Sequence, residues 1–136
     1  MPIEPAPIGP PAYSECLPRT RESARPARAM VTSALRVWDL EEYADSAQSI
    51  VTELIANAAA YGSQSLVRVT VTLTGPDSVR IGVVDRSAVL PERHTAGEDD
   101  ESGRGLAIID SLTGGCWGVD QLPWGKRVWA EIGVKS

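Results

Sequence analysis

The spacing of apolar residues changes from a helical to a strand-like period at Gly62, and no other feature of the sequence limits the fold as strongly. Residues 41–62 open with acidic side chains, which suit the positive end of a helix dipole, and end at that glycine. Their apolar residues share one helix face: Ile50, Val51, Leu54, Ile55 and Ala58. Residues 66–85 instead alternate apolar and polar side chains around a "GPDS" turn, which predicts an antiparallel hairpin whose apolar face packs on the helix.

The same kind of pattern predicts the remaining elements. Residues 24–40 carry another helical stripe after a candidate N-cap at Ser23, with Pro26 tolerated in the first turn. Residues 86–102 lose all periodicity and become acidic, which is typical of a long loop that serves as a lid or a binding segment. A short helix follows in "GRGLAIIDSLTGG", and "CWGV" and "RVWAEIGV" predict two strands joined by a "PWGK" turn.

This order of elements predicts an α/β fold. Helix, helix, strand, strand, loop, helix, strand, strand gives a two-layer sandwich with a mixed, mainly antiparallel sheet covered on one face by helices. With 136 residues we expect one domain at 19–136. Residues 1–18 hold six of the ten prolines and should be disordered or extended, with a short strand at 15–18.

Composition excludes several classes of function. A net charge of -5 argues against binding nucleic acid or an anionic membrane through bulk electrostatics. No apolar run approaches the roughly 18 residues of a membrane helix, and no secretory leader pattern is present. Cys16 and Cys116 lack metal-ligand spacing, so we expect free thiols in a reducing compartment and a cytoplasmic protein.

Glu53 and Asn57, in "ELIANA", are polar residues within an apolar helix. Because they lie four residues apart, they share one side of that helix. An Asn oxygen suits Mg²⁺, which binds few protein groups plus substrate phosphates. A Glu one turn earlier could orient or deprotonate a nucleophile that attacks a phosphate. The alternative is a solvated or capped pair at the edge of the core.

Two more polar clusters follow along the chain. Asp85 ends the apolar strand of "VVDRSAVLP", where its carboxylate could accept a hydrogen bond from a ligand amine or could simply open a turn. In "ESGRGLAII", Gly103 and Gly105 stand where the chain enters a helix, so backbone N–H groups could hold phosphates, or the glycines could serve only as a flexible joint. His94 has no companion ligand or base and is interpreted as solvated.

Together these motifs, in this order and spacing, resemble the GHKL superfamily with its Bergerat fold, which includes gyrase and sensor histidine kinases. The resemblance is strongest to its stand-alone branch, the anti-sigma factor serine/threonine kinases common in actinobacteria. It runs from about Arg28 to Val134 and includes the closing hairpin "WGVDQLPWGKRVWAEI". A short chain has no room for the phospho-accepting helix of a histidine kinase or the further domains of gyrase, so we expect a free-standing module.

The resemblance implies a set of site residues and ligands. Glu53 would be catalytic, Asn57 would hold Mg²⁺, and Asp85 would recognise the adenine of ATP. The phosphate-binding box would be Gly103, Arg104, Gly105 and Leu106, and Lys126 in the closing hairpin would also contact the nucleotide. Arg127 stands where the family often has a Thr that assists the adenine carboxylate.

The resemblance also implies partners. The protein would sequester a sigma factor, phosphorylate an anti-anti-sigma factor and form a homodimer, with no direct contact to nucleic acid or membrane. The alternative is a regulator of the same fold that binds a nucleotide or a partner without transferring phosphate.

Overall fold

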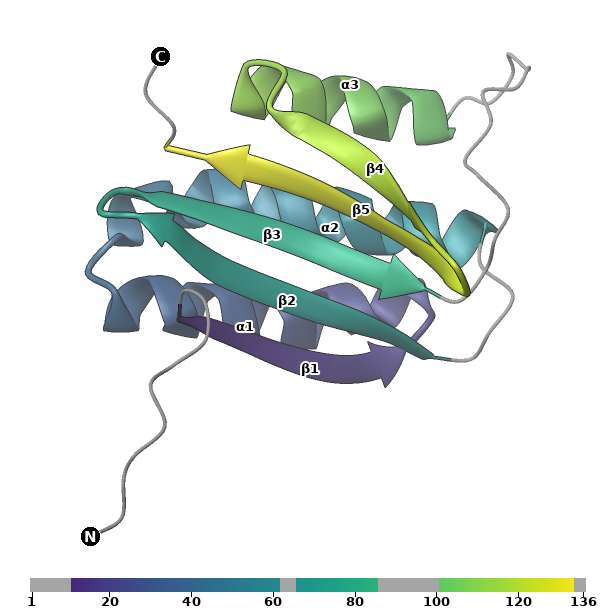
Figure 1. Ribbon diagram of the computed structural model, residues 1–136, viewed down its shortest axis with the longest axis horizontal. Coiled ribbons are helices and arrows are strands. Elements are labelled where there is room, and N and C mark those ends of the chain that lie inside the picture. The colour runs from purple at the N-terminus through teal and green to yellow at the C-terminus, as the bar shows by residue number, and fades with distance from the viewer. Residues whose placement is uncertain (1–10, 62–65, 86–100, 134–136) are drawn as a thin grey trace, which may run out of the picture.

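The structure of the chain is a computed structural model that describes residues 11–61, 66–85 and 101–133. One layer is a five-stranded sheet, and the other consists of helices on one face of that sheet (Figure 1). The strands are β1 (Ala12–Pro18), β2 (Leu66–Gly75), β3 (Ser78–Asp85), β4 (Trp117–Leu122) and β5 (Gly125–Ile132). The helices are α1 (Ala24–Val37), α2 (Ala44–Tyr61) and α3 (Glu101–Thr113), with 3₁₀ turns η1 (Arg21–Ser23) and η2 (Glu41–Tyr43) before α1 and α2.

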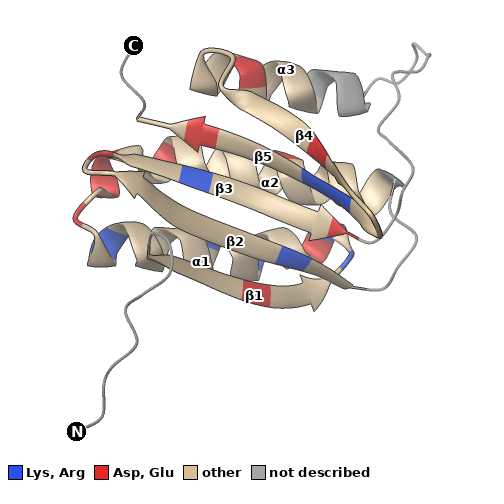
Figure 2. Ribbon diagram, in the orientation of Figure 1, with Lys and Arg blue, Asp and Glu red and all other residues tan. Residues whose placement is uncertain are grey.

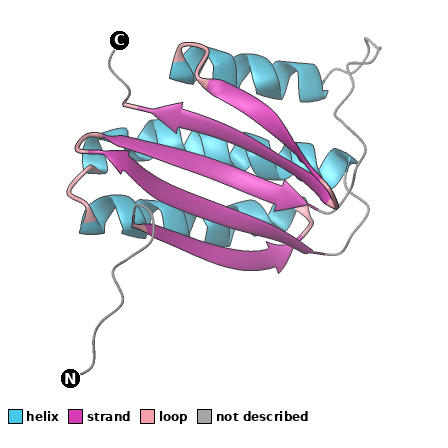
Figure 3. Cartoon of the chain, viewed as in Figure 1, coloured by secondary structure: helices cyan, strands magenta, loops and turns pink. Residues whose placement is uncertain are grey.

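The strands lie in the order β1-β2-β3-β5-β4 (Figure 3), and every pair between the described strands is antiparallel. Both predicted hairpins are confirmed: Gly75 pairs with Ser78 across the first turn, and Leu122 pairs with Gly125 across the second. The predicted two-layer α/β sandwich is therefore confirmed, but the sheet, which was predicted to be mixed, is antiparallel throughout the described strands.

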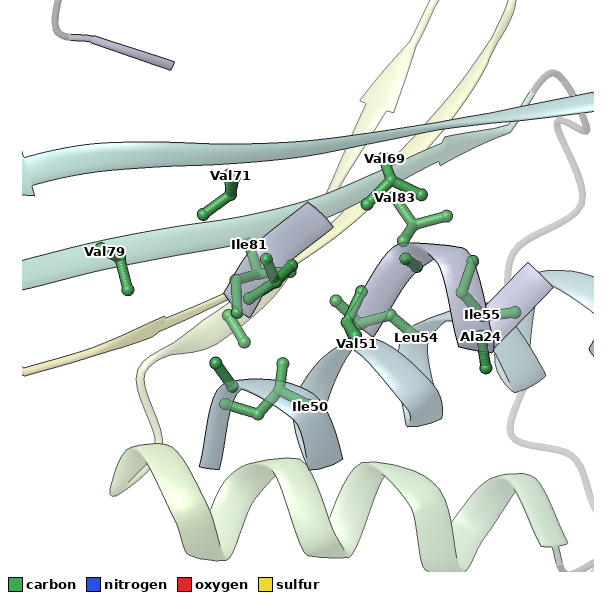
Figure 4. Packing of buried hydrophobic residues seen from close by; sticks show 14 of the residues in the cluster. Ala24, Ile50, Val51, Leu54, Ile55, Val69, Val71, Val79, Ile81 and Val83 are labelled. Atoms are coloured by element: carbon green, nitrogen blue, oxygen red, sulfur yellow. The ribbon is translucent and has the colours of Figure 1, made fainter. Parts of the chain in front are cut away.

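The core lies between the two layers. Alternate residues of β2, β3 and β5 face α2, as Figure 4 shows for Val69, Val71, Val79, Ile81 and Val83. All five residues of the predicted α2 stripe are buried: Ile50, Val51, Leu54, Ile55 and Ala58. Burial of apolar side chains at about 25 cal/mol per Å² is the main force that holds the helices on the sheet.

Two local predictions need correction. β1 begins at Ala12 rather than at residue 15, and six of its seven residues are not buried, so it had little hydrophobic pattern to reveal it. Ser23 precedes α1 but makes no side-chain cap, because η1 runs directly into α1 and leaves Ser23 in a helical rather than an extended conformation. Its hydroxyl donates to the Pro18 carbonyl instead.

α2 and β3 run in the same direction, so the C-terminal end of α2, near Asn57, and the C-terminal end of β3, at Asp85, lie at the same end of the molecule (Figure 1). At one end of the molecule, a Cβ built on Gly133 after β5 would lie 3.1 Å from the ring of Tyr43 and 3.1 Å from the Cα of Ser78. The starts of α2 and β3 therefore lie together, and their C-terminal ends share the opposite end of the molecule (Figure 1). No helix in the described ranges is long and apolar enough to cross a membrane.

Candidate functional site

Asp85 and Lys126 form a buried ion pair at the C-terminal end of β3. The strand register pairs them directly, and both continue the inward-facing columns of Val83 and Val128. Figure 2 shows acidic colour at the C-terminal end of β3 and basic colour near the start of β5. The Lys126 Nζ lies 3.3 Å from each carboxylate oxygen of Asp85, and the two residues are only 1% and 3% exposed. The apolar core of the sheet thus ends in one acceptor and one donor group.

Arg127 does not take the place expected for it beside Asp85. It pairs with Val84 in the register, so its side chain lies on the other face of the sheet, where its guanidinium bonds Asp120 at 2.9 and 3.1 Å. Since side chains alternate along a strand, the residue beside the Asp85 carboxylate is Lys126. Arg127, which stands where the family often has a Thr, therefore lies on the sheet face away from the helices, here called the open face.

The open face carries its own electrostatic cluster. Hydrogen bonds from Arg127 hold the pKa of Asp120 below its usual value, the Trp129 indole adds a weaker bond, and partial burial opposes both. Arg80 stacks over the Trp129 ring at 4.0 Å and bonds Glu131 at 3.0 Å. This cluster stabilises the sheet on the face away from α2.

Asn57 is 5% exposed and lies near the C-terminal end of α2. Neither its amide nitrogen nor its amide oxygen has a hydrogen-bond partner in the part of the chain that the structure describes. An unpaired buried amide costs about 1–3 kcal/mol, and buried side-chain amides in folded proteins are almost always paired. A bound group that supplies partners would remove this cost.

Glu53 lies one helical turn before Asn57 and faces the first part of α3. A Cβ built on Gly105 would lie 2.7 Å from the Glu53 carboxylate oxygen Oε1, so the absence of a side chain at 105 lets the carboxylate approach the α3 backbone. Gly105 itself is buried. Glu53 of the first polar motif and Gly105 of the glycine motif, to which the sequence assigned separate roles, therefore lie against each other between α2 and α3.

A groove of about 410 Å³ opens on the outer face of the helical layer and reaches Glu53. It runs between α1, α2 and α3 and is lined by Arg28, Asp45, Gln48, Ser49, Thr52, Glu53 and Ile108. Arg28 bonds the Thr52 hydroxyl at 3.1 Å, and Gln48 bonds Thr32 of α1 at 2.9 Å. Sequence periodicity could not reveal these lining residues, because the groove arises from the packing of three helices.

The other predicted site residues lie in α3 or outside the described ranges. Gly103 and Arg104 belong to the first turn of α3, where the structure describes the backbone but not the Arg104 side chain. Leu106 is partly buried and packs against the core. Residues 86–100, which include His94 and most of the predicted lid, are likewise outside the described residues.

Comparison with known families agrees with this geometry. The model of the histidine kinase-like ATPase domain matches residues 17–131, which is most of the chain. The chain belongs to that family. A histidine kinase-like ATPase domain binds ATP, and this one has the Asp85 carboxylate at the end of β3, the Asn57 amide without a described partner near the end of α2, and the Glu53–Gly105 approach between α2 and α3. A search of curated proteins gives no match.

The residues fit ATP with Mg²⁺. In the described ranges no three His, Cys, Asp or Glu side chains gather as they would in a metal site made by protein alone. Mg²⁺ often binds through one or two protein oxygens together with phosphates and water, which is what the unpaired Asn57 amide could provide. Asn57 therefore offers an oxygen for the metal, one helical turn after the Glu53 carboxylate that lies against α3 at Gly105.

Proposed function

We propose that this ATP-binding domain is a serine/threonine protein kinase that depends on ATP and Mg²⁺. The observation that carries the proposal is the position of Glu53, which touches α3 at Gly105 and also lines the groove on the outer face. A carboxylate at this junction could meet an acceptor hydroxyl that approaches along the groove.

Each residue has a distinct role in the proposal. Asp85 accepts a hydrogen bond from the adenine amine, and the Asn57 oxygen is the protein ligand for Mg²⁺. Gly103 and Arg104 lie in the first turn of α3, where N–H groups favour anions, and Gly105 and Leu106 follow in the next turn. ATP supplies the phosphoryl group and Mg²⁺ neutralises its charge when both are bound. Glu53 orients the acceptor hydroxyl and takes its proton.

The proposal extends to protein partners. We propose that the kinase sequesters a sigma factor and phosphorylates an anti-anti-sigma antagonist, acting as a homodimer. The support is the resemblance of the motifs around Glu53, Asp85 and Gly105 to anti-sigma kinases. The open groove supports a protein acceptor, since its charged, polar and apolar lining can contact a polypeptide that reaches Glu53.

A phosphotransfer assay tests the kinase. The protein is incubated with γ-labelled ATP, Mg²⁺ and candidate antagonist domains, alongside Glu53→Gln and Gly105→Ala variants. We expect label transfer to serine or threonine in the wild type and a loss of about 10²-fold or more in Glu53→Gln, as for removal of a positioned base. Gly105→Ala should fold, because only the flexible end of Glu53 must move, yet the displaced carboxylate should lower the rate by up to about 10²-fold.

Ser111→Ala, on the exposed face of α3, is the matched control and should transfer label like the wild type. ATP binding without transfer to any acceptor would contradict the kinase and favour the second candidate, a nucleotide-dependent binding regulator. That candidate draws on the same unpaired Asn57 amide, which calls for a ligand but not for a reaction. Transfer that is equal in wild type and Glu53→Gln would contradict the role of Glu53.

A further inference from the structure

Lys126 is a buried cation whose position requires an explanation. Its side chain is 1% exposed, and removing an ammonium from water costs several kcal/mol unless its donors are satisfied. An ammonium has three N–H donors. Its hydrogen bonds to described residues are the two at 3.3 Å to the Asp85 oxygens. At least one donor therefore has no acceptor in the part of the chain that is described.

The geometry of the pair leaves Lys126 able to bond something else. Charge-assisted N–H···O bonds are commonly 2.7–2.9 Å long. Here both contacts are longer and equal, so the ammonium lies between the two oxygens and is not drawn fully onto either one. A third, better acceptor beside the pair would complete its coordination. The pair thus presents a carboxylate acceptor and an ammonium donor next to each other.

The Watson–Crick edge of adenine is the complement of such a pair. Its 6-amino group donates, and the adjacent ring nitrogen N1 accepts. Enzymes that read an unpaired base commonly bond this edge. A carboxylate alone can satisfy only the amino group, whereas the pair of Asp85 and Lys126 has one partner for each position.

We propose that Lys126 is a second base-reading residue, which donates to N1 of adenine while Asp85 accepts from the 6-amino group. The inference rests on the proposed ATP site and adds the determinant of base specificity to it. Guanine offers an acceptor at position 6 and a donor at N1, so it would fit only if the two side chains exchanged places. Their fixed neighbouring positions in the strand register oppose that exchange.

The test compares ATP with 1-deaza-ATP, in which a C–H group replaces N1. Binding of both nucleotides is measured by calorimetry for the full chain, without any need for an acceptor protein. We expect the wild type to bind 1-deaza-ATP about 10-fold or more weakly, the loss typical of one hydrogen bond from a charged donor. GTP should bind at least as weakly as the analogue.

Variants assign the effect to Lys126. Lys126→Met alone removes the ammonium that neutralises the buried Asp85 carboxylate, which can unfold the protein. The double variant Asp85→Asn/Lys126→Met removes both charges and keeps an acceptor for the amino group. It should bind ATP and 1-deaza-ATP within about 2-fold of each other, the difference expected once the charged donor is gone. Arg127→Met, which removes the neighbouring cation on the opposite face, is the control and should keep the wild-type ratio.

Three outcomes would overturn the inference. Equal affinity of the wild type for the two nucleotides would show that N1 is not read. A double variant that folds and keeps the wild-type ratio would assign the reading to another donor. Failure of the wild type to bind ATP at all would overturn the proposed function as well, whereas the first two outcomes leave that function intact.

Discussion

Asn57 shows at the scale of one residue how a functional position differs from its neighbours in the same helix. It lies between Leu54, Ile55 and Ala58, which are all buried, yet its own buried amide has no partner among the described residues. Ordinary packing would favour an apolar side chain here. A position that costs stability in the free protein is a common property of binding sites.

We therefore expect Asn57→Leu to stabilise the free protein. The change removes an unpaired buried amide, worth about 1–3 kcal/mol, and adds apolar burial, so the free energy of unfolding should rise by about 1–3 kcal/mol. Urea denaturation followed by circular dichroism measures it. Thr52→Val is the matched control in the same helix and should lose about 1 kcal/mol, because the Thr52 hydroxyl bonds both Arg28 and the Gln48 carbonyl. A destabilised Asn57→Leu would show that the amide is satisfied.

Sequence reasoning reached Glu53, Asn57 and Asp85 because each is a polar residue in an apolar element. Lys126 was reached only by resemblance, although a signal for it existed. Counting back in twos from Ile132, Ala130 and Val128 places residue 126 on the buried face of β5. The ion pair could not be predicted from the sequence, because it depends on which residue of β3 lies opposite Lys126 in the strand register.

At the scale of the elements, α1 ends in a conformation that its sequence does not favour. Asp39 has φ 62°, in the left-handed region where residues with a Cβ are disfavoured. The Asp39 N–H bonds the Arg36 carbonyl and the Leu40 N–H bonds the Leu35 carbonyl. These two bonds form a Schellman motif, which usually has glycine at this position.

Asp39→Gly should therefore stabilise the protein by about 0.5–1 kcal/mol, since it relieves a left-handed residue without removing a backbone bond. Thermal unfolding measures the change. Ser33→Gly, at an exposed interior position of the same helix, is the control and should cost about 0.5 kcal/mol, because glycine disfavours a helix interior. A loss of stability in Asp39→Gly would mean that the Asp39 side chain contributes more than the strain it carries.

The β4–β5 hairpin should respond to pH through Asp120. Because Arg127 lowers the pKa of this carboxyl in the folded state, the pair stabilises the protein above the ordinary Asp pKa. That contribution is lost as the pH falls through the lowered pKa. Both side chains are about 40% exposed, so the contribution is at most about 1 kcal/mol and salt should weaken it.

Asp120→Asn tests this contribution by urea denaturation across pH. The deficit of the variant relative to the wild type should be largest at neutral pH and should shrink toward pH 3. High salt should reduce it at neutral pH. A deficit that stays constant from neutral to acid pH would assign the loss to packing and not to the ion pair.

Prediction from sequence succeeded for elements whose apolar residues recur with a regular period. It failed where backbone pairing alone sets the bounds of a strand. α1, α2, β2 and β3 each bury a regular stripe, and their order predicted the fold. In β1 only Leu17 is buried, so pairing with β2 defines the strand and no hydrophobic pattern marked its start. The groove lined by Arg28 and Ile108 was invisible for a related reason, since it belongs to no single element.

At the scale of the whole molecule, nucleotide binding should be coupled to global stability. A ligand that binds only the folded chain adds about 2.7 kcal/mol at 100 times its Kd, which corresponds to a rise in Tm on the order of 5–15 °C for a domain of this size. We expect that rise with ATP and Mg²⁺ and a clearly smaller one when EDTA removes the metal. Asn57→Leu should show little metal dependence. Equal shifts with and without Mg²⁺ would contradict Asn57 as a metal ligand.

The turn between β4 and β5 gives the molecule a built-in optical reporter. Trp124 lies in this turn, two residues before Lys126, and 53% of its surface is exposed. The other three tryptophans are elsewhere: Trp38 contacts Tyr13 at the end of α1, Trp117 bonds Asp110, and Trp129 lies on the open sheet face. Nucleotide binding beside Lys126 should therefore change one component of the intrinsic emission, and Trp124→Phe should abolish that change.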